Sequence, residues 1–90
     1  MIKLSEGYLI EKLEIGILYI DPTPKFGRKE SYLFKTSPHS IYMLIVYKDN
    51  SKGLYEDSIP RTFWRYISVP STTEWVQKTY FSEILMEDIL

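Results

Sequence analysis

Hydrophobic positions along this 90-residue chain change their spacing from one third of the sequence to the next. Across residues 13–20 they recur with a period of two, which indicates a β-strand. Residues 41–47 form an uninterrupted apolar run rich in branched and aromatic side chains, as is typical of a strand buried on both faces. Residues 31–35 and 54–57 complete a predicted antiparallel sheet of about four strands, with 54–57 at an edge. The sparse pattern in residues 1–11 leaves helix and strand both open.

Turn-forming residues separate these predicted strands. Pro22 and Pro24 lack the N–H donors that a ladder requires, so the strand over 13–20 should end before them. Residues 36–39 are expected to form a turn. Residues 49–53 predict a hairpin loop in which Gly53 can adopt a positive φ.

The last third of the chain has helical spacing. Pro60 suits the first turn of a short helix that carries Phe63, Trp64 and Ile67. A second, longer helix is predicted from a capping-box pattern over 71–74 to about residue 88. Strands first and helices last predict an α+β fold, a single domain over residues 1–90, whose sheet in the N-terminal two-thirds is covered by one short and one longer C-terminal helix.

Missing residue types exclude several kinds of chemistry. The chain contains no cysteine, so disulfides, thiolate metal sites and cysteine nucleophiles are excluded. His39 is the single histidine and is interpreted as a turn residue. We therefore expect no enzyme activity, no metal and no cofactor. The longest apolar run is far shorter than the roughly 18 residues of a membrane span, so a cytoplasmic protein without membrane contact is expected.

One segment, residues 61–66, combines arginine with aromatic side chains. Arg61, Trp64, Arg65 and Tyr66 have the composition of a protein-binding hot spot. The simpler interpretation is that Trp64 belongs to the core, with Phe63 and Ile67, and that the arginines are solvated. We take the four residues as the candidate partner-binding site.

A second group lies in the loop after the two prolines. Lys25, Phe26, Arg28 and Lys29 place three cations beside an aromatic ring, which suits contact with phosphates or with an acidic partner. An ordinary solvated loop is the alternative. The formal net charge of −1 argues against strong, salt-dependent affinity for nucleic acid.

Part of the chain is similar to a known short domain. Tyr47, Tyr55, Ile59-Pro60, Pro70-Ser71 and Tyr80-Phe81 resemble positions of the KTSC domain. The glycine that follows the serine in that family is missing here, and the spacing from Ser71 to Tyr80 is longer. No function is inferred from this resemblance.

Small size, the missing catalytic residue types and the surplus of aromatic residues predict a non-catalytic protein-binding module. The many lysines, isoleucines and tyrosines, with no alanine, suggest a low-GC coding sequence. By analogy with such proteins, we expect a phage- or virus-encoded inhibitor of a host enzyme or defence complex. The alternative is a nucleic-acid-binding domain that uses Lys25, Phe26, Arg28 and Lys29 with segment 61–66. A homo-oligomer is compatible with either function.

Overall fold

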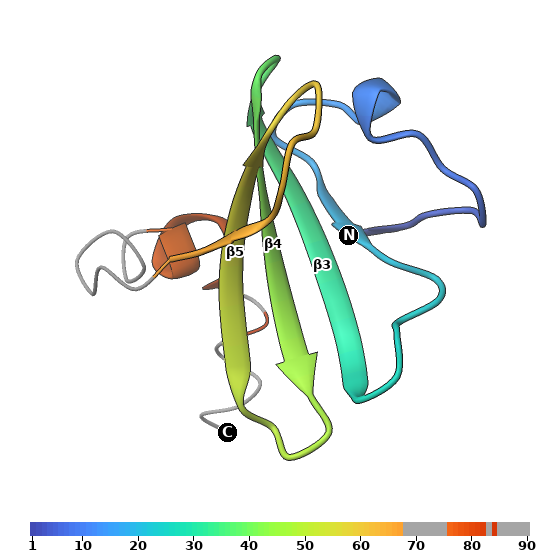
Figure 1. Ribbon diagram of the computed structural model, residues 1–90, viewed down its shortest axis with the longest axis vertical. Helices are drawn as coiled ribbons and strands as arrows, with labels where there is room; N and C mark the ends of the chain where they lie inside the picture. Colours follow the sequence, from blue (N-terminus) through green and yellow to red (C-terminus); the bar gives the residue numbers. More distant parts are fainter. Residues whose placement is uncertain (68–75, 83, 85–90) are drawn as a thin grey trace.

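The chain forms one mixed sheet of six strands. The computed structural model describes residues 1–67, 76–82 and 84, and the statements below concern these residues. The strands are β1 (Ile2–Lys3), β2 (Leu18–Ile20), β3 (Arg28–Ser37), β4 (Ser40–Tyr47), β5 (Lys52–Ser58) and β6 (Arg65–Tyr66), and they lie side by side in that order (Figure 1). Strand β1 runs parallel to β2, and every other pair is antiparallel. Sequence neighbours are therefore sheet neighbours.

Strand β4 lies at the centre of the sheet, and this position explains its continuous apolar sequence. Ile41, Met43 and Ile45 face one hydrophobic core, while Leu44 and Val46 face a second core on the other side. A strand buried on both faces has no position for a polar side chain. The prediction of a central strand over 41–47 is confirmed.

The N-terminal segment covers the first face of the sheet. It contains a 3-10 turn, η1 (Ile10–Lys12), and contributes Leu4, Ile10 and Leu13 to the first core. Lys35 of β3 is buried, and its Nζ donates to the carbonyl oxygens of Glu11 and Leu13, both at 3.2 Å. These two hydrogen bonds connect the turn to the sheet and satisfy a buried cation.

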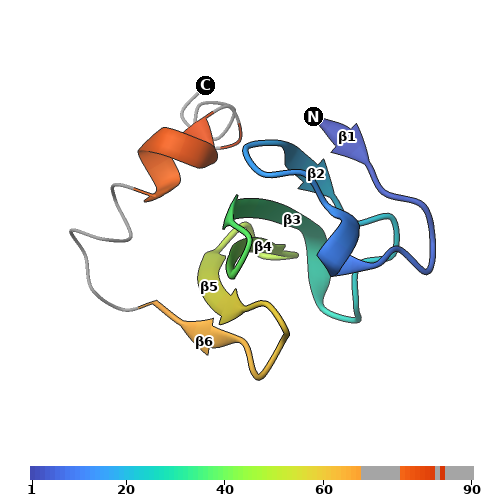
Figure 2. The same ribbon diagram turned by 90° about the horizontal axis from the view of Figure 1, so that it is seen from above.

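A helical segment covers the second face. Residues 76–80 are helical, and Val76, Phe81 and Ile84 join the second core. Phe34 of β3 stacks on Tyr80 with ring centroids 4.2 Å apart, and it meets Phe81 edge-on at 6.4 Å. Figure 2 shows this segment and the N-terminal segment on opposite sides of the sheet.

The predicted α+β class is wrong. The described residues are mostly strand, with one short helical segment and a 3-10 turn, and the sheet has six strands of mixed direction rather than about four antiparallel ones. Within the described residues one short helical segment covers one face, in place of the predicted cover of two helices. The predicted capping box at 71–74 and the end of the helix near residue 88 lie outside the described residues.

The short helix predicted from Pro60 to Ile67 is also wrong. The chain forms a loop after the cis Ile59–Pro60 peptide and returns as β6, which pairs with β5. The Asp57 carboxylate explains the difference, because its Oδ1 accepts the N–H groups of residues 58, 62 and 63. A side chain that binds nearby N–H groups favours a turn over a helix.

Three smaller expectations change as well. The strand predicted over 13–20 is reduced to β2, because Gly16 adopts a φ of 82° and its N–H donates to Lys35. In the β4–β5 hairpin the residue with positive φ is Asn50, not Gly53, which lies within β5. Strand β5 is not an edge, since β6 flanks it. Within the described residues, none of the helices has the length and apolar character to cross a membrane.

Candidate binding site

A small basic pocket opens on the first face of the sheet. Its volume is about 120 Å³. We call it the basic pocket, and it is lined by Tyr8, Ile10, Asp21, Lys25, Arg28, Leu33, Met43, Arg61 and Trp64. The N-terminal segment, the loop before β3, strands β3 and β4, and the loop before β6 all contribute to it. The pocket therefore joins two groups of candidate residues that lie more than thirty positions apart in the sequence.

Arg61 is held in place from two sides. Its Nε donates to Asp57 Oδ2 at 3.2 Å, and its guanidinium carbon lies 4.9 Å from the centre of the Trp64 ring. The side chain remains 45% exposed. A cation that rests on an indole face and is oriented by a carboxylate is pre-organised for a ligand.

Lys25 and Arg28 supply charge that no ion pair among the described residues neutralises. Lys25 is exposed and Arg28 is half-buried, and neither side chain forms a hydrogen bond or ion pair with a described residue. Asp21 is the one carboxylate of the pocket. Its Oδ1 accepts the Thr23 N–H at 2.9 Å and its Oδ2 accepts the Tyr8 hydroxyl at 3.4 Å. The pocket thus has three cations and one occupied carboxylate.

Tyr8 remains a hydrogen-bond donor at any physiological pH. Burial, and then the charge and hydrogen bond of Asp21, raise its pKa to about 12, against an opposing effect of Arg61. The phenol is therefore protonated.

Tyrosines extend the site along the same face of the sheet. Arg28 lies opposite Tyr47 in the β3–β4 pairing. The hydroxyls of Tyr47 and Tyr55 are 2.9 Å apart, and Tyr66 meets Tyr55 edge-on at 5.5 Å. Gly53 leaves room for this arrangement, because a Cβ there would lie 2.9 Å from the Tyr55 ring. Half-buried tyrosines beside arginine are typical of binding surfaces.

The candidate residues predicted from the sequence are divided between the two faces. Arg61, Trp64, Lys25 and Arg28 line the basic pocket, and Tyr66, 57% exposed, lies beside Tyr55. Arg65 lies on the opposite face, where it forms an ion pair with Glu56.

The predicted loop is shorter than expected, because Arg28 and Lys29 belong to β3. Two residues of this group, Phe26 and Lys29, lie outside the pocket. Lys29 reaches Asn50 Oδ1 at 3.4 Å. Phe26 is fully exposed, with Lys48 Nζ 5.5 Å from its ring centre.

Four polar residues of the site were not predicted: Tyr8, Asp21, Tyr47 and Tyr55. Tyr47 and Tyr55 are in predicted strands, so only the strand register was missing to place them beside Arg28. Tyr8 gave no such signal, because its segment has no clear periodicity.

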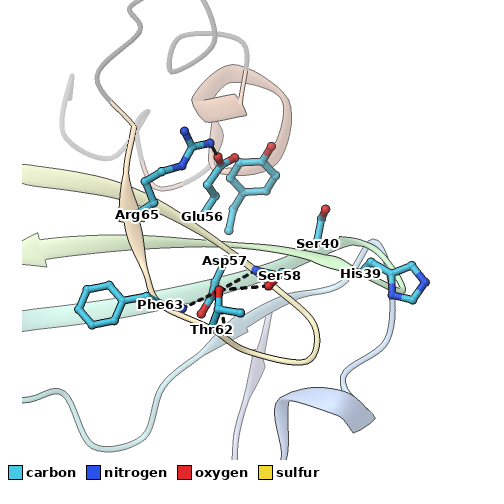
Figure 3. Close-up of a pocket in the computed structure, with 9 residues that line it drawn as sticks. His39, Ser40, Glu56, Asp57, Ser58, Thr62, Phe63 and Arg65 are labelled. Atoms are coloured by element: carbon cyan, nitrogen blue, oxygen red, sulfur yellow. Dashed lines mark hydrogen bonds and ion pairs between the residues drawn. The ribbon is translucent and has the colours of Figure 1, made fainter.

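A larger hollow of about 320 Å³ lies beside strand β5 and the loop that follows it (Figure 3). Its carboxylates are engaged, since Glu56 pairs with Arg65 and Asp57 is buried in the loop. The His39 ring contacts the Ile59 carbonyl oxygen at 3.2 Å and lies apart from both carboxylates in Figure 3. These contacts assemble no nucleophile with a base. Among the described residues, no three His, Cys, Asp or Glu side chains are grouped as a metal would require.

Asp57 organises the loop between this hollow and the basic pocket. Its side chain is fully buried, and besides Arg61 it binds the N–H groups of Ser58, Thr62 and Phe63 at 2.7, 3.2 and 3.1 Å and the Thr62 hydroxyl at 3.1 Å. Burial acts to raise the pKa of Asp57, but these hydrogen bonds outweigh it and hold the pKa below its ordinary value of 3.8.

Acid is therefore expected to weaken the fold through Asp57. Because its pKa is lower in the folded state than in the unfolded state, its contribution is complete above pH about 4 and is lost as the pH falls through the folded-state value. Urea unfolding at pH 7, 4 and 3 measures this loss. Asp57→Asn should show a smaller fall between pH 4 and pH 3. Equal falls in the two proteins would show that other carboxylates cause the acid sensitivity.

Comparison with known proteins adds no relative. No protein-family model matches the chain, and no curated protein or solved structure matches it significantly. The resemblance to the KTSC domain therefore has no support from a family model.

Proposed function

We propose that this chain is a non-catalytic protein-binding module and that its binding surface is the basic pocket with the tyrosines beside it. One observation carries the proposal: Lys25 and Arg28 line the same pocket as Arg61 and Trp64, although the two pairs come from distant parts of the chain. Arginine and tryptophan at the centre of a concave surface are the residue types that dominate binding energy in protein interfaces. Uncompensated positive charge also selects partners and accelerates association.

The biological setting is proposed by analogy. Small stand-alone proteins of low-GC composition include phage and viral inhibitors of host enzymes and defence complexes, and we place this chain in that class, acting in the cytoplasm. The analogy rests on size and composition. In this proposal the basic pocket is the surface that binds the host protein.

Nucleic-acid binding is the second candidate, and one observation favours it. Phe26 is fully exposed beside Lys48, and Lys25 is its sequence neighbour. An exposed ring among cations is the arrangement on which single-stranded bases stack. The near-neutral net charge opposes strong binding of this kind.

Affinity capture from a low-GC bacterial lysate separates the two candidates. The tagged protein is incubated with lysate that has or has not been treated with nuclease. We expect a discrete protein that is recovered equally in both samples. Recovery that disappears after nuclease treatment, or retention of nucleic acid alone, would replace the proposal with the nucleic-acid function.

A further inference from the structure

We propose that the basic pocket is a receptor for a single glutamate side chain, presented by an acidic segment of the partner protein. This inference rests on the proposed function and specifies the chemistry of the partner. Its basis is that one pocket combines positive charge, an apolar floor formed by Ile10, Leu33 and Met43, and hydrogen-bond donors that are already held in place.

The charge of the pocket favours an anion. Lys25 and Arg28 have no hydrogen-bonding partner among the described residues. Arg61 uses only Nε on Asp57, and within the same part of the chain its two terminal nitrogens donate to no other residue. Asp57 offsets the charge of Arg61, and Asp21 offsets one of the other two, which leaves one positive charge in excess. Both oxygens of Asp21 already accept hydrogen bonds. A carboxylate bound here would gain charge-assisted hydrogen bonds, which are stronger than neutral ones.

The floor of the pocket favours a carboxylate on an aliphatic stem. Ile10, Leu33 and Met43 supply apolar surface beneath the cations. The methylene groups of glutamate can bury against this floor, while inorganic phosphate has no apolar part to bury there. Asp21 further disfavours a dianion, because a like charge repels two negative charges more than one.

The walls are already arranged for such a ligand. Arg61 is fixed between Asp57 and Trp64, and Tyr8 is fixed by Asp21. Groups that are ordered before binding lose little conformational entropy when the ligand arrives. The volume of about 120 Å³ suits one side chain rather than a folded surface.

The test follows the indole N–H signal of Trp64 in the full ¹⁵N-labelled chain during titration with a blocked hexaglutamate peptide. Trp64→Phe assigns the signal, since Trp75 is the only other tryptophan. The reference titrations use hexaglutamine, inorganic phosphate and a thymidine oligonucleotide. We expect a saturable shift with hexaglutamate, weakened by salt, and no saturable shift with hexaglutamine.

Matched variants localise the effect. Arg28→Gln should weaken hexaglutamate binding about tenfold, because one charge-assisted contact is lost. Lys3→Gln removes the same charge from exposed strand β1 and should change the affinity less than about twofold. Equal losses in both variants, equal shifts with hexaglutamine, or no shift at all would overturn the inference.

The remaining outcomes separate this inference from the proposed function. A stronger response to phosphate or to the oligonucleotide would overturn the glutamate assignment. Capture of a nuclease-resistant partner by a protein that ignores hexaglutamate would leave the protein-binding function standing without this inference. Saturable hexaglutamate binding with no captured protein would leave the pocket chemistry standing and remove the function.

Discussion

Replacing Asp57 with alanine is expected to lower the free energy of unfolding by roughly 2–3 kcal/mol, because the N–H groups of Ser58, Thr62 and Phe63 lose their shared acceptor. A chain of this length has only about 5–13 kcal/mol of stability, so the loss is a large share. The same change frees Arg61 from its carboxylate and should loosen one wall of the basic pocket. Urea unfolding followed by circular dichroism measures the first effect.

Asp57→Asn is the informative control. It keeps the Oδ1 that accepts the N–H groups and removes the oxygen that binds Arg61. Its loss should be about half that of the alanine variant. If both variants are as stable as the wild type, the carboxylate does not organise this loop.

Replacing Phe81 with alanine should cost about 3–4 kcal/mol, because a fully buried aromatic side chain is removed from the second core. The large effect is expected only if the helical segment after residue 75 covers this face of the sheet. Thermal or urea unfolding measures it.

Phe63→Ala is the matched control for this prediction. Phe63 is 83% exposed, so its removal should change the free energy of unfolding by less than about 0.5 kcal/mol. Had the chain formed the helix predicted from Pro60, Phe63 would lie in the core and its removal would cost as much as that of Phe81. Similar losses in the two variants would contradict the fold described above.

The fold was predictable where local pattern and tertiary position agree. The apolar run of β4 indicated a central strand, because a strand that is buried on both faces needs apolar side chains at every position. The helix predicted after Pro60 was wrong for a local reason. Phe63, Trp64 and Ile67 have helical spacing, but the Asp57 side chain binds the backbone N–H groups of this segment and holds it as a loop. As a result Phe63 is exposed and Ile67 is buried, although a helix would place both on one face.

The binding site was predictable only in parts. The sequence identified Arg61 and Trp64 in one segment and Lys25 and Arg28 in another, but assigned them to alternative functions. Their convergence depends on how the first residue of β3 and the loop before it meet the loop before β6 on the same face of the sheet. Alternation within β6 explains why Arg65 is excluded, since it faces the opposite side from Tyr66.

The claim that the basic pocket binds the partner is tested most directly by capture with a charge-reversed variant. Lys25→Glu/Arg28→Glu should retain the circular dichroism spectrum and melting temperature of the wild type and recover less than about a tenth of the nuclease-resistant partner, because like charges replace complementary ones. Lys3→Glu/Lys12→Glu, which makes the same charge change at exposed positions outside the pocket, should recover the wild-type amount. Wild-type recovery by the Lys25→Glu/Arg28→Glu variant would show that the basic pocket does not bind the partner.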